Sequence, residues 1–199
     1  MHESDSENLG YDDLWILKFN KQKEHMFLER IPDHFLEDKF NFYLLKDQVE
    51  DFKDAYCAIL DEGPSINFVS ECKLYYYLHQ RYIVYNKSGT SNIIENVRSK
   101  VYGSCSKYGC KESPFIPVGL SNEFGRGKTK LYCNSCKSLY EPKGVLKKLD
   151  GCVWGTILCP YLILMNVYCF TQNNKKEYTP KLFGFEIEVD ENSNLDNSE

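Results

Sequence analysis

The sequence has no apolar stretch long enough to cross a membrane. Its most apolar segment, Ile157 to Phe170, is interrupted by Pro160 and Asn166, whereas a transmembrane helix needs about 20 apolar residues. The first eight residues are acidic and polar, without the basic start and apolar stretch of a secretory signal. We therefore expect a protein without a membrane partner, working in the cytoplasm and the nucleus.

An excess of basic charge is also missing. The chain of 199 residues has 24 lysine and arginine residues against 29 aspartate and glutamate residues, a net charge of −5. Proteins that bind nucleic acids are usually basic. The composition therefore argues against nucleic acid as the main partner, although the 42% of apolar residues is enough for a folded core.

Catalytic motifs are missing as well. There is no kinase His-Arg-Asp motif and no Gly-x-Ser-x-Gly elbow. Residues 125–129 resemble the end of a phosphate-binding loop, but Asn122 stands where that loop needs a glycine. We interpret this segment as a flexible basic hairpin loop. No pair at metal-ligand spacing is formed by the four histidines, His2, His25, His34 and His79. Binding is therefore the more economical class of function, and we predict no catalytic residue.

What the chain does have is nine cysteines, four of them in two close pairs. Cys105 and Cys110 have four residues between them, Cys133 and Cys136 have two, and 22 residues separate the pairs. This spacing predicts a zinc ribbon in which four thiolates surround one structural Zn²⁺ per chain, with no open position for catalysis. The competing interpretation is four buried free thiols. We expect the other five to behave as small apolar residues: Cys57, Cys72, Cys152, Cys159 and Cys169.

The pattern before Val101 is helical, and after it the pattern is not. Apolar periodicity and capping residues predict helices at Leu9–Phe19, from Pro32 onward, at Asp47–Leu60, from Ser65 or Asn67 to about Tyr85, and at Ser91–Lys100. Glycine, proline and cysteine then become frequent, and strands are predicted at Phe115–Val118, Lys130–Tyr132 and Lys137–Tyr140. The apolar segment 150–170 should pack against the ribbon or the helices.

These patterns predict an α+β fold with five parts. An acidic disordered N-terminus (1–8) precedes an all-helical domain (9–100) and a zinc-ribbon domain of antiparallel strands that dimerises (101–172). A linker and an extended C-terminal docking segment follow (173–190), and a disordered tail ends the chain (191–199).

The docking segment is the second strong signal. Residues 181–189 alternate like a strand and contain the apolar side chains Leu182, Phe183, Phe185 and Ile187. A polar linker precedes them and the acidic tail follows. An extended segment with two aromatic rings can add to a partner's sheet or occupy a partner's groove; the competing interpretation is a closing strand of the domain. Ser4, with an acid three residues on, fits an acid-directed phosphorylation site.

Taken together, these features resemble the regulatory (beta) subunit of casein kinase II along nearly the whole chain. The resemblance is carried by five stretches, in the same order and spacing: Glu37-Asp38-Lys39-Phe40-Asn41 with Leu44; Leu78-His79-Gln80-Arg81-Tyr82-Ile83; Pro117-Val118-Gly119-Leu120-Ser121; Lys130-Leu131-Tyr132-Cys133 with Cys136, Tyr140 and Pro142; and Pro180-Lys181-Leu182-Phe183-Gly184-Phe185.

The resemblance implies a non-catalytic chain whose zinc ribbon forms a homodimer. The dimer would bridge two catalytic (alpha) subunits in a tetramer, stabilise them and modulate the choice of protein substrates. Docking would use Phe183 and Phe185, with Ile187 and Leu182 beside them, and the kinase would phosphorylate Ser4. The family usually has tyrosine at the position of Phe183.

One departure and one rival remain at this stage. The family carries an acidic loop that attracts basic ligands, and here it shrinks to residues 61–64 with two carboxylates, so this attraction should be much lower. The rival is a zinc-ribbon transcription or nucleic-acid-binding factor. It could use only Arg126, Lys128 and Lys130 as a basic feature.

Overall fold

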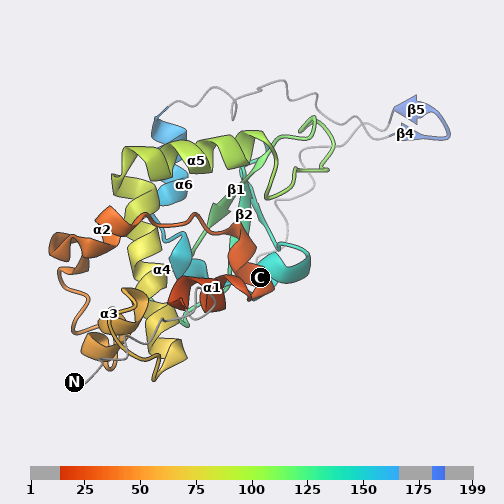
Figure 1. Ribbon diagram of the computed structural model, residues 1–199. Helices are drawn as coiled ribbons and strands as arrows, with labels where there is room; N and C mark the ends of the chain where they lie inside the picture. Colours follow the sequence, from red (N-terminus) through yellow and green to blue (C-terminus); the bar gives the residue numbers. More distant parts are fainter. Residues whose placement is uncertain (1–13, 166–180, 187–199) are drawn as a thin grey trace, which may run out of the picture.

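The computed structural model describes residues 14–165 and 181–186 (Figure 1). The helices are α1 (Trp15–Asn20), α2 (Asp33–Glu37), α3 (Phe52–Ile59), α4 (Phe68–Tyr85), α5 (Lys87–Arg98) and α6 (Leu158–Leu164). Short 3₁₀ helices lie at Lys23–Phe27, Lys39–Phe42, Gly144–Lys148 and Gly151–Val153. The strands are β1 (Phe115–Val118), β2 (Lys130–Cys133), β3 (Ser138–Tyr140), β4 (Lys181–Leu182) and β5 (Phe185–Glu186). The predicted α+β class is confirmed.

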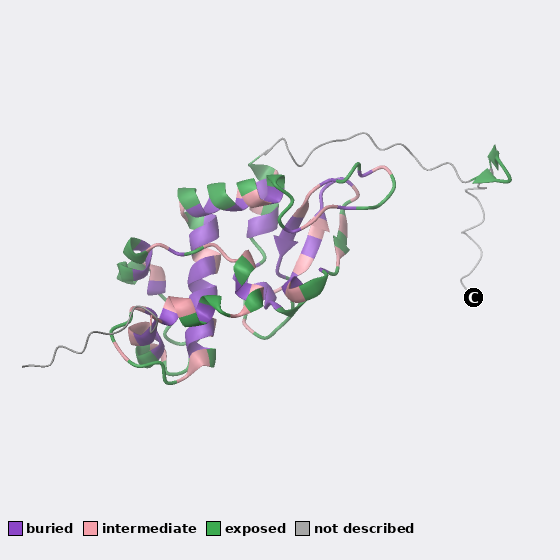
Figure 2. Cartoon of the chain, turned by 45° about the vertical axis from the view of Figure 1, so that its right-hand side comes forward, coloured by how far each residue is buried: buried purple, intermediate pink, exposed green. Residues whose placement is uncertain are grey.

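Helix α4 is the centre of the molecule, as its nearly continuous apolar surface predicts. Most of its residues are buried (Figure 2), and α3, α5, α6 and the 3₁₀ helices at Lys39–Phe42 and Gly151–Val153 contact it. The Asn67 side chain accepts a hydrogen bond from the Ser70 N–H at its start, so Asn67 is the cap. At its end, Asn86 accepts from the N–H groups of Ser88 and Gly89 and thereby starts α5. Helix α5 thus begins at Lys87, four residues before the predicted Ser91.

One other predicted helix has different bounds, and one unassigned segment proves to be partly helical. The predicted helix at Asp47–Leu60 begins only at Phe52, because Asp51 adopts a left-handed conformation with φ 51°. Turns occupy the residues before it, and they bury Leu45 and Val49. The apolar segment 150–170, which had no assigned structure, contains a 3₁₀ helix and α6, and α6 contacts both α4 and β1. Its remainder lies outside the described residues.

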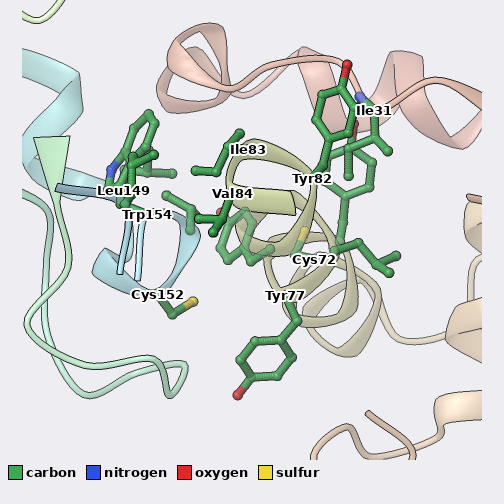
Figure 3. Close-up of a cluster of buried hydrophobic side chains, with 14 of the residues drawn as sticks. Ile31, Cys72, Tyr77, Tyr82, Ile83, Val84, Leu149, Cys152 and Trp154 are labelled. Atoms are coloured by element: carbon green, nitrogen blue, oxygen red, sulfur yellow. Dashed lines mark hydrogen bonds between the residues drawn. The ribbon is translucent and has the colours of Figure 1, made fainter. Parts of the chain in front are cut away.

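The helical part and the ribbon share one large hydrophobic core, and a small second cluster surrounds the paired cysteines of the ribbon. Trp154 and Leu149, from the chain after β3, pack beside α4 (Figure 3). Fully buried His79 joins the two parts: its Nδ1 lies 3.0 Å from the Val153 carbonyl oxygen, and its Nε2 accepts from the Glu29 N–H at 3.0 Å. Gln80 donates to the Cys152 carbonyl oxygen at 2.8 Å. The helical part therefore holds the ribbon in a fixed position.

Within residues 14–165 and 181–186, no helix has the length and apolarity that a membrane crossing requires. The cysteines outside the two pairs fit their predicted role where the structure describes them. Cys72, Cys152 and Cys159 belong to the core, and burial raises the pKa of Cys72 and of Cys159 to about 12. Cys57 is partly buried, and Cys169 lies outside the described residues.

Candidate metal centre and docking hairpin

The three strands of the ribbon explain why the two cysteine pairs meet. Strands β1, β2 and β3 form an antiparallel sheet in which Phe115 pairs with Cys133 and Cys133 pairs with Ser138. The first pair lies in the loop that leads into β1, and the second pair lies where β2 turns into β3. Since β1 begins opposite the end of β2, both turns are at the same end of the sheet.

Each turn depends on local conformations that the sequence permits. The first turn is closed by the Cys105 N–H donating to the Ser113 carbonyl and the Ser113 N–H donating to the Cys110 carbonyl. Gly109 within it has φ 83°, a conformation that glycine adopts without steric cost. These bonds turn the Cys105 and Cys110 side chains toward the second pair.

The four predicted ligands do come together. The sulfur atoms of Cys105, Cys110, Cys133 and Cys136 lie within 4.8 Å of one another. The Cys105–Cys136 sulfur separation is 3.9 Å and the Cys110–Cys133 separation is 4.0 Å. Tetrahedral zinc with bonds of about 2.3 Å requires sulfurs about 3.8 Å apart. A disulfide requires about 2.05 Å. The cluster therefore has the donor set and spacing of a site that could hold a metal ion.

The Tyr140 hydroxyl belongs to this cluster, and sequence reasoning did not single it out. It lies 3.1 Å from the Cys136 sulfur and accepts from the Cys105 thiol at 3.5 Å. Burial by itself would raise the pKa of the Cys136 thiol, but hydrogen bonds led by that of Tyr140 lower it to about 6. A tyrosine on the strand after the second pair was the available signal. Its hydroxyl favours the thiolate, which is the form that binds metals.

Residues 125–129 were expected to form a flexible loop, but hydrogen bonds fix the second half of this loop to the chain after β3. The Gly127 carbonyl accepts from the Gly151 N–H at 2.8 Å. Thr129 is fully buried, and its hydroxyl donates to the Leu149 carbonyl and accepts from the Trp154 indole. A phosphate-binding loop would need the Thr129 hydroxyl free to bind Mg²⁺, so the rejection of that function is supported.

The C-terminal segment is a hairpin, so the expected continuous strand is wrong. Lys181 pairs with Glu186 and Leu182 pairs with Phe185. The two turn residues, Phe183 and Gly184, have φ 51° and 91°, as in the tight turns that join twisted strands. Gly184 was the signal for this turn. Ile187 and Ser4 lie outside the described residues.

The hairpin has one apolar face and one charged face. Leu182 and Phe185 form a cross-strand pair and therefore share a face, while Lys181 and Glu186, 3.2 Å apart, form an ion pair on the other. The exposed fractions are 58% for Leu182, 93% for Phe183 and 79% for Phe185. A bulky residue at positive φ costs about 1–2 kcal/mol. Such strain, together with exposed rings, is typical of a binding element.

Carboxylates in and beside the shortened acidic loop accept hydrogen bonds from the chain itself, so they are less available to a basic ligand. The Asp61 carboxylate accepts from the Trp15 N–H at 2.7 Å. Nearby, the buried Glu71 carboxylate accepts from the Trp15 indole, the Ser65 hydroxyl and the N–H groups of Ile66 and Asn67. Carboxylates here hold the loop against α1 and α4.

Comparison with known proteins identifies a single family. The family described as "Casein kinase II regulatory subunit" matches residues 14–186. The chain is 29% identical to the Drosophila melanogaster "Casein kinase II subunit beta'" over 183 residues, covering 87% of this chain and 83% of that protein. It is 31% identical over 184 residues to the "Suppressor-of-stellate-like protein" of the same species (88% and 80% covered). It is 28% identical over 198 residues to "Casein kinase II subunit beta'" of Saccharomyces cerevisiae (93% and 76%).

Proposed function

Because this chain belongs to the casein kinase II regulatory subunit family, we propose that it dimerises through its ribbon and holds catalytic subunits of that Ser/Thr kinase with its C-terminal hairpin. The family is one of regulatory, non-catalytic chains, so the chain is a regulator and not an enzyme. The observation that carries the proposal is that the family match, over residues 14–186, includes both the four-cysteine cluster and the hairpin. The nucleic-acid-binding alternative is not favoured.

The metal in this proposal is one structural Zn²⁺ per chain. Four thiolates complete a tetrahedron and leave no position for water or substrate, so the ion's contribution is to folding. Structural zinc in such sites contributes on the order of 10–16 kcal/mol, more than the net stability of an ordinary domain. Losing one ligand should therefore unfold the ribbon and, with it, the surface proposed for dimerisation.

The ribbon offers apolar surface that a second copy would bury. Leu120 follows β1, Leu139 lies on β3 and Ile157 precedes α6, and all three side chains are exposed. Their burial in a homodimer would place two hairpins on one particle. Two catalytic subunits bound in this way would complete the proposed tetramer, in which the regulatory dimer stabilises the kinase and modulates its choice of protein substrates.

The hairpin docks in this proposal through its apolar face and its tip. Phe183 and Phe185 are the two anchors, Leu182 contacts the partner beside them, and Ile187 stays a predicted contact. Buried aromatic anchors of this type each contribute about 2 kcal/mol or more to binding. Phe183 lacks only the hydroxyl of the tyrosine that is usual in the family, so its ring still fills the same volume.

The test is capture of the purified catalytic subunit by the immobilised full-length chain. Phe183→Ala combined with Phe185→Ala should weaken capture at least about 30-fold, since 2 kcal/mol corresponds to that factor. The matched control, Lys181→Ala with Glu186→Ala, changes the opposite face of the same hairpin and should retain capture within about threefold. Undiminished capture by the double phenylalanine variant would remove the docking proposal.

A further variant separates the hairpin from its rings. Phe183→Asn places a residue that tolerates positive φ in the turn, so the hairpin should form at least as well while one anchor is lost. Reduced capture by this variant assigns the effect to the ring rather than to the turn.

We also propose that the kinase phosphorylates Ser4 and that the assembly works in the cytoplasm and the nucleus. Mass spectrometry of the chain after incubation with the kinase tests the first point, and imaging of a tagged chain tests the second.

A further inference from the structure

One face of the molecule is rich in exposed lysine and has no role in the function proposed above. The 3₁₀ helix Lys23–Phe27, which follows α1, packs against the 3₁₀ helix Gly144–Lys148 of the ribbon part. Five exposed lysines stand on or directly beside these two short helices. We call them the lysine face: Lys21, Lys23, Lys143, Lys147 and Lys148.

The carboxylates near this face do not balance its charge. Residues 18–30 and 141–150, which contain the face, have seven basic side chains against four carboxylates. Three of the four are engaged by other parts of the chain: Glu29 by the Asn96 amide, Glu141 by Lys130, and Asp150 by the N–H groups of Gly125 and Cys152. The fourth, Glu24, is partly buried. Over the described residues none of the five lysines forms an ion pair, so the face keeps a surplus of positive charge.

The chain enters the described structure close to this face. Leu14 directly precedes the six residues of α1, and α1 packs against the 3₁₀ helix that begins at Lys23. With a rise of about 1.5 Å per helical residue and at most about 3.4 Å per residue after the helix, Lys23 lies within about 20 Å of Leu14. Ser4 stands ten positions before Leu14, and ten residues span about 17 Å as a coil and at most about 35 Å when extended. Residues 3–7 can therefore reach the lysine face.

The N-terminal segment complements the lysine face in charge. Residues 1–13 contain five carboxylates and no lysine or arginine, and Glu3, Asp5 and Glu7 surround Ser4. Phosphorylation of Ser4 adds about 1.5 to 2 negative charges and three acceptor oxygens in the middle of this acidic run, and ammonium groups are good donors to phosphate. The C-terminal tail 187–199 is acidic too, but residues 166–180 and the hairpin separate it from the ribbon in the sequence. Nearness along the chain therefore favours the N-terminus.

We propose that residues 3–7 dock on the lysine face of their own chain when Ser4 is phosphorylated. The phosphate and the three carboxylates pair with lysine ammonium groups, and the short tether gives an effective concentration in the millimolar range, so weak pairs suffice. Phosphorylation itself moves the γ-phosphoryl group of a nucleoside triphosphate to the Ser4 oxygen, with release of the hydroxyl proton and the nucleoside diphosphate. The inference rests on the proposed function for the phosphorylation of Ser4 and goes beyond it by giving the phosphorylated segment a binding site.

The test uses the full-length chain with phosphoserine encoded at position 4, so that no kinase is needed, and with a dye on its N-terminal amine. Time-resolved fluorescence anisotropy separates dye that tumbles with the folded protein from dye on an undocked segment. In 50 mM salt we expect the ratio of docked to undocked chains to be about tenfold higher with phosphoserine than with serine, because two negative charges are added. Raising the salt to 300 mM should lower this ratio about fivefold.

Two matched variants of the phosphoserine chain locate the docking site. Lys23→Gln, Lys147→Gln and Lys148→Gln together remove most of the charge of the lysine face. They should lower the ratio of docked to undocked chains at least about tenfold. The three side chains are exposed, so the fold should be retained.

The control variant is Lys39→Gln, Lys46→Gln and Lys53→Gln. These lysines are exposed too, and they lie within residues 37–54, where six carboxylates outnumber them. The change in net charge is the same as in the first variant, but the ratio of docked to undocked chains should stay within about twofold of the parent.

A zero-length carbodiimide cross-linker identifies the pairs, because it joins a lysine amine only to a carboxylate in contact with it. Isotopically light and heavy chains are unfolded, mixed and refolded together with zinc before the reaction. The expected cross-links join Glu3, Asp5 or Glu7 to the lysine face within one chain.

Four outcomes would overturn the proposal. They are phosphoserine without effect on the anisotropy of the folded chain; equal losses in the two triple variants, which would reduce the effect to net charge; cross-links mainly between light and heavy chains, which would place the segment on a second copy; and cross-links of the lysine face mainly to residues 187–199, which would assign it to the C-terminal tail. Incubation of the serine chain with the catalytic subunit is a separate measurement. Absence of phosphate on Ser4 there would remove the kinase's proposed action on it, while the docking result with encoded phosphoserine would stand.

Discussion

Protonation of the buried His79 should make this protein lose stability in mild acid. The ring is fully buried between α4 and the ribbon, and burial lowers its pKa from 6.5 to about 4, outweighing the hydrogen bond to the Val153 carbonyl. Because Nε2 must accept the Glu29 N–H, a proton added there would also break that contact.

The sign and size of the effect follow from proton linkage. Above pH 6.5 the histidine is neutral in both states, so the native structure retains its full stability. As the pH falls from 6.5 toward 4, the unfolded chain binds a proton that the native chain does not. The free energy of unfolding should fall by about 2 kcal/mol between pH 7.5 and pH 5, and by about 3 kcal/mol in all below pH 4.

The assay is urea unfolding at pH 7.5 and pH 5.0, with His79→Gln as the comparison. Two other groups titrate over part of this range: hydrogen bonds lower the pKa of the Cys136 thiol to about 6, and burial lowers the pKa of His25. The wild-type loss alone is therefore not diagnostic. The glutamine variant keeps a donor and an acceptor but has no proton to gain. Its loss of stability should be about 2 kcal/mol smaller than that of the wild type. Equal losses in the two proteins would refute the reasoning.

Two further predictions concern buried hydrogen bonds. Tyr140→Phe removes the hydroxyl that contacts the sulfurs of Cys105 and Cys136 and should lower zinc affinity about tenfold in chelator competition; affinity equal to that of the wild type would show that the hydroxyl has no effect on the metal. Glu71→Gln turns an amide NH₂ toward donors that include the Trp15 indole, and we expect the free energy of unfolding to fall by about 2 kcal/mol in urea titration. An unchanged denaturation midpoint would contradict the organising role of this carboxylate.

The ribbon could be predicted well from the sequence because its signals are local. Strand β1 has the predicted bounds, Phe115–Val118, and the four cysteines meet because antiparallel pairing brings both turns to one end of the sheet. Cysteine spacing and strand alternation each depend on residues close together in the chain. Tyr140 was missed because its role depends on which way one side chain turns on β3.

The helical part was predicted less well where tertiary contacts override local pattern. Residues 47–51 continue the apolar spacing of the helix that follows them, yet they form turns, and the left-handed conformation of Asp51 (φ 51°) delays the start of α3 to Phe52. The predicted start of α5 was four residues too late because the Asn86 cap was overlooked. Only this one residue separates α4 from α5, so in the sequence it resembles the interior of one long helix. Alternation at residues 181–189 resembled a strand, although Gly184 already permitted the reversal that makes it a hairpin.

The most direct measurement of the central claim is native mass spectrometry of the full-length chain mixed with the catalytic subunit. The account predicts one main species containing two copies of this chain, two catalytic subunits and two zinc ions, which loses its assembly when a strong chelator removes the metal. A folded, metal-free monomer that leaves the catalytic subunit at its own mass would contradict it.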